Sequence, residues 1–171
     1  MTELFGRTNK WSGTYGPEWL VTIADEISSL GSRTIVFLEI VFFITYLYII
    51  KYKEKLREFV AAAIGGLLLL LVLKVIFSEN YSQVSLLRTE GLIFPSGHAM
   101  MAVIMYYKIP SLIFPLGFKN YGNIFIKTSV ILLALLVGIS RLIVGAHTPF
   151  EVIAGFAGGV LWIYISEKYL K

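Results

Sequence analysis

The sequence predicts an all-α membrane protein, a bundle of about five transmembrane helices with an amphipathic surface helix at its N-terminal end. The first observation is composition, because 57% of the 171 residues are hydrophobic, only 15% are charged and the mean hydropathy is +0.76. A soluble domain has roughly 45–50% apolar and about 25% charged residues. The second observation is that the apolar residues form runs whose lengths are close to the roughly 20 residues that a helix needs to cross a bilayer.

Five runs are long and apolar enough to be predicted as spans. They are residues 34–50, 59–77, 99–116, 128–146 and 149–165. The third run is the least regular, because Lys108, Pro110 and Pro115 interrupt it and can kink the helix or end it early. The chain length suits one domain. We therefore expect a single membrane-embedded domain over 1–171, with an interfacial segment at 1–32 and the transmembrane bundle at 33–171.

A short amphipathic helix is expected before the first span. Its apolar face would be formed by Trp19, Leu20, Ile23, Ile27 and Leu30. Gly16 and Pro17 favour a helix start, and Gly31 favours a stop. Such a helix can lie on the membrane surface or pack against a neighbouring helix, and the sequence favours neither arrangement.

The distribution of basic residues predicts the orientation of the bundle. The connection at 51–58, Lys119, Lys127 and the C-terminal tail place eight Lys and Arg residues on one side, against four on the other. Cytoplasmic loops carry the excess of basic residues, so we expect the side with eight to face the cytoplasm across the inner membrane. The basic residues form no stripe of the kind that duplex nucleic acid needs, and we expect no nucleic-acid partner.

The two histidines of the chain lie in polar motifs at the ends of predicted spans. His98 closes the segment Pro-Ser-Gly-His at 95–98, and His147 lies in the connection between the fourth and fifth spans. Lys74 is near the end of the second span. Because alternate connections fall on opposite sides of a membrane, we expect all three at the face opposite the lysine-rich connection.

These motifs resemble those of the type 2 phosphatidic acid phosphatase (PAP2) family, whose three signatures are K-x6-R-P, P-S-G-H and S-R-x5-H-x3-D. The second is complete at 95–98, and the third is present at 140–151 with Glu151 in place of Asp. On typical residue frequencies each would arise by chance in a chain of this length on the order of once in a thousand. The resemblance implies a membrane-embedded helical phosphatase and covers roughly residues 27–165.

The first signature is incomplete. Tyr81 and Ser82 follow Lys74 at the positions where the family has Arg and Pro. We expect Arg88, later in the same connection, to supply the missing guanidinium, and the alternative is a site with one cation fewer. The family usually has six spans, so its first helix is expected to be shortened or lost here.

The resemblance implies hydrolysis of a lipid phosphate without a metal ion or other cofactor. His147 is implied to be the nucleophile that forms a phosphohistidine, and His98 the acid that protonates the leaving oxygen, roles that imidazole can fill near pH 7. The cations implied to bind the phosphate oxygens are Lys74, Arg88 and Arg141. Ser96 and Gly97 begin the third span, where a helix N-terminus and a close backbone approach favour an anion.

Glu151 has two possible roles. It lies four residues after His147, a spacing that puts both side chains on one helix face, so its carboxylate could orient the imidazole. Alternatively, the segment from Thr148 to Glu151 forms a capping box with Pro149 at the first helical position.

The three cations also have structural explanations. Lys74 can extend to the interface, and Arg88 can simply be solvated. A charge at Arg141 is too costly to leave unpaired in a span, and its structural explanation is a salt bridge with Glu39, which could equally pair with Lys74.

The sequence therefore favours a lipid phosphatase whose site opens at the extracytoplasmic face, with the bilayer and a membrane lipid phosphate as partners. The connection at 78–94 is too short for a large lid, which favours lipid A 1-phosphate or undecaprenyl diphosphate over phosphatidylglycerophosphate or phosphatidate. Two other functions remain open, a lipid-binding or lipid-translocating module without turnover and a sparse metal site on His147 and Glu151. A vanadate-dependent haloperoxidase shares the signatures, but the five apolar spans argue against it.

Overall fold

The computed structural model describes residues 16–82, 94–113 and 120–170, which form helices without any strand. The helices are α1 (Glu18–Ser29), α2 (Arg33–Ile49), α3 (Lys53–Ser82), α4 (Gly97–Ile113), α5 (Asn120–Ile143) and α6 (Pro149–Tyr169). The predicted all-α class is confirmed.

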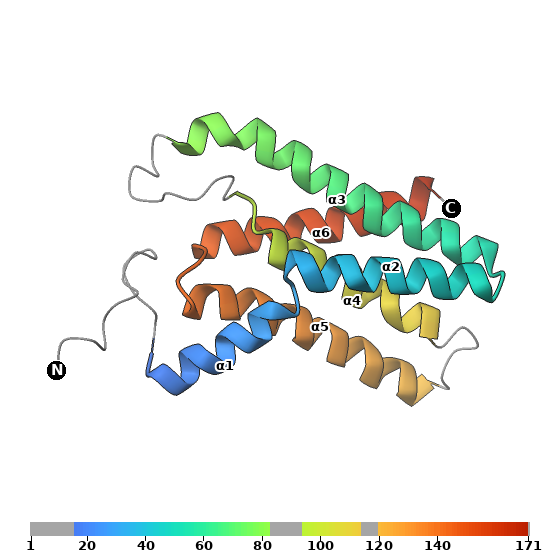
Figure 1. Cartoon of the computed structure of the whole chain (residues 1–171), viewed down its shortest axis with the longest axis horizontal. Coiled ribbons are helices and arrows are strands. Elements are labelled where there is room, and N and C mark those ends of the chain that lie inside the picture. The colour runs from blue at the N-terminus through green and yellow to red at the C-terminus, as the bar shows by residue number, and fades with distance from the viewer. Residues whose placement is uncertain (1–15, 83–93, 114–119, 171) are drawn as a thin grey trace.

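Helix α4 is the centre of the bundle. It packs against α6, α5, α3 and α2, and buried side chains line it from Ala99 to Tyr106. The turn between α5 and α6 and the starts of α2 and α4 lie at one end of the bundle, and the turn between α2 and α3 lies at the other (Figure 1). The residues of the two histidine motifs are therefore brought to the same end.

Each of the five predicted spans corresponds to one of the helices α2 to α6. Within the residues that the structure describes, three stretches are long and apolar enough to cross a membrane, namely Glu18–Ile49, Lys53–Phe77 and Pro149–Tyr169. Helix α3 continues past the predicted end at Phe77 to Ser82, so it shortens the connection to α4. Helix α4 continues through Pro110 to Ile113, so this proline does not end it.

The N-terminal amphipathic helix is present as α1, but its buried face is not the predicted apolar one. Helix α1 packs on α5, and its buried residues are Ala24 and Ser28. Trp19 and Ile23 remain 64% and 50% exposed. The small residues let α1 approach α5 closely, and Ile27 packs against the core beside them, while Trp19 and Ile23 stay exposed. The helix thus packs against a neighbour and also keeps an apolar surface.

Gly155 sets the distance between α4 and α6 next to the histidine motifs. A β-carbon at this position would lie 2.5 Å from the carbonyl oxygen of Ser96 and 3.1 Å from the β-carbon of Ala99. The backbone N–H of Ser96 also donates to the carbonyl oxygen of Glu151 at 3.0 Å. The first turns of α4 and α6 are therefore held together by direct backbone contact.

Gly155→Ala is expected to destabilise the protein by at least about 2 kcal/mol, because the new methyl group meets backbone atoms that cannot move aside. The matched control is Gly158→Ala, where the nearest atom is the flexible sulfur of Met100 at 3.4 Å. That control is expected to leave stability unchanged or to raise it by up to about 1 kcal/mol. Thermal unfolding of the detergent-solubilised protein measures both, and equal effects would contradict the prediction.

Candidate active site

The turn between α5 and α6 presents His147 at the end of the bundle. Gly145 has a φ of 69°, in the left-handed region that favours glycine. The N–H groups of Ala146 and His147 both donate to the carbonyl oxygen of Arg141, at 3.0 and 3.2 Å. Pro149 then starts α6 at a position where its missing N–H costs nothing.

Glu151 contacts both the imidazole and the helix backbone through a single oxygen. Its Oε2 lies 2.8 Å from Nδ1 of His147 and accepts a hydrogen bond from the backbone N–H of Thr148 at 3.0 Å. The hydroxyl of Thr148 accepts in return from the N–H of Glu151, which completes the capping box. Glu151 thus makes both contacts that the sequence left open, one with the imidazole of His147 and one within the capping box.

The His147–Glu151 pair is almost fully removed from water, since the two side chains are 10% and 3% exposed. Burial lowers the pKa of His147 below its ordinary value of 6.5. The hydrogen bond and the charge of Glu151 act in the opposite direction, and the positive charges of Arg141 and Lys74 add to the lowering. The imidazole therefore stays neutral at a lower pH than a free histidine.

The segment before His98 holds the start of α4 in place. Ser96 is fully buried, and its Oγ accepts a hydrogen bond from the N–H of Ala99 at 3.4 Å, so it caps the helix. The backbone N–H of Ser96 donates to the carbonyl oxygen of Glu151 in α6. A β-carbon at Gly97 would lie 3.1 Å from Cδ2 of Leu70 and 3.8 Å from Cε of Lys74, so the start of α4 packs closely on α3 and Lys74 lies beside the motif.

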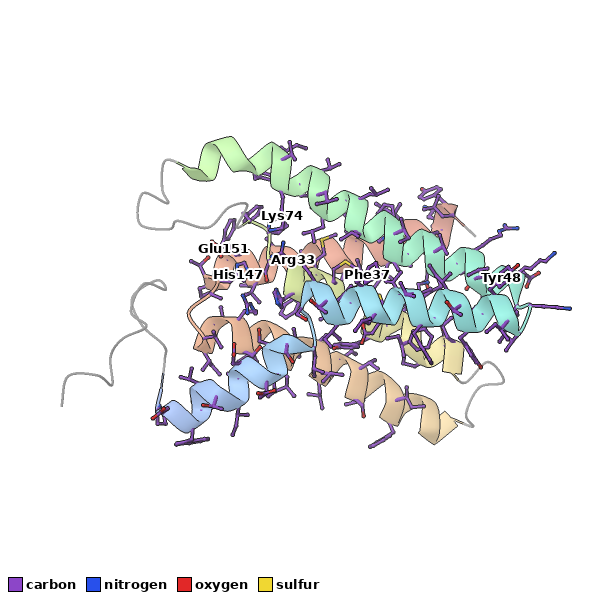
Figure 2. The ribbon with its side chains drawn as sticks, viewed as in Figure 1. Arg33, Phe37, Tyr48, Lys74, His147 and Glu151 are labelled. Carbon is purple, nitrogen blue, oxygen red and sulfur yellow. The ribbon has the colours of Figure 1, made fainter. Side chains whose placement is uncertain are left out.

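The two histidines lie close to two of the predicted cations, Lys74 and Arg141. Arg141 and Lys74 are both near enough to act electrostatically on His98 and on His147. His147 is also near enough to act on His98 in this way. Figure 2 shows Lys74, His147 and Glu151 gathered at one end of the bundle, although they come from α3, the α5–α6 turn and α6.

Arg33 is a further cationic neighbour that the sequence analysis did not select. It is the first residue of α2, and its charge acts on His98 and on Lys74. Figure 2 shows it beside Lys74. The available signal was its position, since it is the basic residue that begins the first predicted span on the same side of the membrane as the motifs.

The predicted pairing of Glu39 with Arg141 or Lys74 is wrong. Arg141 instead donates to Oγ of Ser28 in α1 at 2.6 Å, with the carboxylate of Asp25 close enough to act on it. Within the described part of the chain, Glu39 forms no ion pair, and its Oε2 is buried without a hydrogen-bond partner. A similar depth in the bundle did not place the two residues side by side, because Glu39 lies on α2 and Arg141 is covered by α1.

Comparison with known proteins identifies the family. The sequence model of the PAP2 superfamily matches residues 59–170. The chain belongs to the PAP2 superfamily. Phosphatidylglycerophosphatase B of Bacillus subtilis (strain 168) is 37% identical over 81 residues, which are 44% of this chain and 38% of that protein. The crystal structure of Aquifex aeolicus LpxE is similar with a TM-score of 0.64 and 27% identity, and it covers 91% of this chain and 89% of its own.

The incomplete first PAP2 signature falls at the end of α3. Lys74 lies within this helix, and Tyr81 and Ser82 form its last turn, where the superfamily signature has Arg and Pro. Arg88 lies outside the described residues. Among the residues that are described, no group of three histidine and carboxylate side chains is arranged to hold a metal ion.

Ser28→Ala is expected to lower the thermal unfolding midpoint by about 3–10 °C, because it removes a hydrogen bond to a charged group worth about 1.5–3 kcal/mol. Ser29→Ala on the same helix is the matched control, since the Ser29 hydroxyl is exposed and bonds only to the carbonyl oxygen of Glu26. Its unfolding midpoint should stay within about 2 °C of wild type. The same midpoint for both variants would argue against a structural contribution of the Ser28–Arg141 contact.

Proposed function

We propose that this PAP2 member is a metal-independent lipid phosphatase that hydrolyses a phosphate monoester or diphosphate of a membrane lipid through a phosphohistidine. The observation that carries the proposal is the buried His147–Glu151 pair, whose 2.8 Å contact fixes Nδ1 and leaves Nε2 as the ring nitrogen that Glu151 does not engage. A second histidine and several cations surround this pair.

In the first half-reaction, Nε2 of His147 attacks the phosphorus and the bond from phosphorus to the leaving oxygen breaks. His98 gives its proton to that oxygen, so the lipid alcohol or lipid phosphate leaves without a build-up of charge. Glu151 holds the proton on Nδ1 of His147 and stabilises the positive ring that forms. Water then attacks the phosphohistidine, passes a proton to His98, and releases inorganic phosphate.

Fixed positive charge favours the transferring phosphoryl group. Lys74 and Arg141 act on both histidines, so a phosphate that touches both rings also meets both cations. We assign Arg88 to the same role by its place in the sequence. Gly97 and Ser96 contribute by bringing the start of α4 against Lys74 and Glu151, so the backbone there can face the phosphate.

We place the site at the extracytoplasmic face of the inner membrane, because the turn between α2 and α3, with Lys51, and the basic start of α3 lie at the opposite end of the bundle. The leading substrates are lipid A 1-phosphate and undecaprenyl diphosphate, since only fourteen residues separate α3 from α4 and these leave no room for a large lid. Phosphatidylglycerophosphate is the second candidate, and the name of the Bacillus subtilis relative favours it.

The proposal predicts that purified protein in detergent releases inorganic phosphate from at least one of these lipids, with and without a chelator. His147→Ala should reduce the rate at least about a thousandfold, because the nucleophile is lost. Lys53→Ala, at the far end of the bundle, is the control and should keep the wild-type rate. Undiminished release by His147→Ala refutes the phosphohistidine, loss of activity in chelator refutes metal independence, and lipid binding without release supports the non-catalytic module.

The dependence of kcat/KM on pH should be bell-shaped, with its acidic limb below pH 6.5. Below the pKa of His147 the ring is protonated and cannot attack, and burial lowers that pKa from 6.5, so the limb moves to lower pH. A basic limb is expected as well, because the reaction also needs a protonated group to give a proton to the leaving oxygen. An acidic limb at pH 7 or above, or a flat profile, would contradict this assignment of roles.

A further inference from the structure

Arg33 is held at the site by a junction that packs directly on α4. A β-carbon at Gly31 would lie 3.1 Å from the carbonyl oxygen of His98, so only a residue without a side chain allows this approach. The hydroxyl of Tyr106, farther along α4, donates to the carbonyl oxygen of Leu30 at 3.0 Å. The side chain of Ser32 then caps α2 by accepting from the N–H of Ile35. These contacts fix the backbone from which Arg33 extends.

The three described cations do not face the two histidines equally. Lys74 and Arg141 act on both rings. Arg33 instead extends from the junction where Gly31 packs on the carbonyl oxygen of His98, and its charge acts on His98 and on Lys74. In the reaction proposed above, His147 marks the side of attack and His98 the side of the leaving group. Arg33 therefore lies on the leaving-group side of the phosphoryl group.

Arg33 is also available for a ligand. Its side chain is exposed, and within the described part of the chain it forms no ion pair and no side-chain hydrogen bond. Arg141, by contrast, is half-buried and already bonded to Ser28. An exposed guanidinium that extends from a rigid backbone beside the acid is suited to bind two oxygens of an anionic group.

We propose that Arg33 binds the anionic leaving group of a lipid diphosphate and so favours diphosphates over monophosphates, an inference that rests on the phosphatase function proposed above. When His147 attacks the terminal phosphorus, the bridging oxygen keeps the electron pair of the broken bond and leaves as part of a lipid monophosphate. This leaving group is an anion, and it forms next to His98 and Arg33. A monophosphate ester instead releases a neutral alcohol once His98 has protonated it, which gives Arg33 nothing to bind.

The experiment compares two substrates that differ only in the second phosphate, farnesyl diphosphate and farnesyl phosphate, with the full-length protein in detergent. Arg33→Gln should raise KM for the diphosphate about tenfold or more and change KM for the monophosphate less than about threefold, as expected for loss of one charge-assisted contact. Arg33→Lys should recover part of the difference, because it keeps the charge and loses the planar donors. Arg57→Gln, an exposed arginine at the opposite end of the bundle, is the control and should change neither.

An equal rise in KM for both substrates, or no rise for either, overturns the proposal. It is also overturned if the wild type releases phosphate from the monophosphate and not from the diphosphate. Failure of the underlying function has a different signature, because His147→Ala would then retain release from both substrates whatever Arg33→Gln does.

Discussion

The site depends on one buried carboxylate oxygen. Oε2 of Glu151 accepts from the backbone N–H of Thr148 and contacts Nδ1 of His147, so the start of α6 and the orientation of the imidazole are fixed by the same atom. A carboxylate that is 3% exposed is tolerated only where hydrogen bonds replace the lost water. The family signature has the shorter Asp here, and the longer Glu side chain still reaches both partners.

The same turn of α6 also positions the second histidine. The carbonyl oxygen of Glu151 accepts from the N–H of Ser96, and Gly155 one turn later leaves space for the carbonyl oxygen of Ser96. Ser96 in turn caps the helix that carries His98. Two residues that lie 49 positions apart in the sequence, His98 and His147, are thus held against one turn of one helix, and the packing of α4 on α6 determines their separation.

Hydropathy predicted the five helices of the bundle, and the alternation of sides predicted that Lys74, His98 and His147 meet at one end. The hydropathy pattern could not predict the contacts of α1, because Ser28 belongs to the polar face that an amphipathic pattern assigns to water. Its partner Arg141 is 113 positions away, and nothing in either local pattern joins them. The predicted salt bridge between Arg141 and Glu39 was wrong for a related reason. The two residues lie at similar depths within their spans, but depth does not determine which helices are neighbours.

Helix α1 provides the polar contacts of Arg141, the arginine of the third signature. At 12 residues it is about 18 Å long, less than the roughly 30 Å of hydrocarbon that a span must cross. It nevertheless supplies the Ser28 contact and the nearby charge of Asp25 that balance Arg141. Leaving the Arg141 charge unpaired within a span would be costly, so these contacts are a sufficient physical reason for α1 to pack on α5.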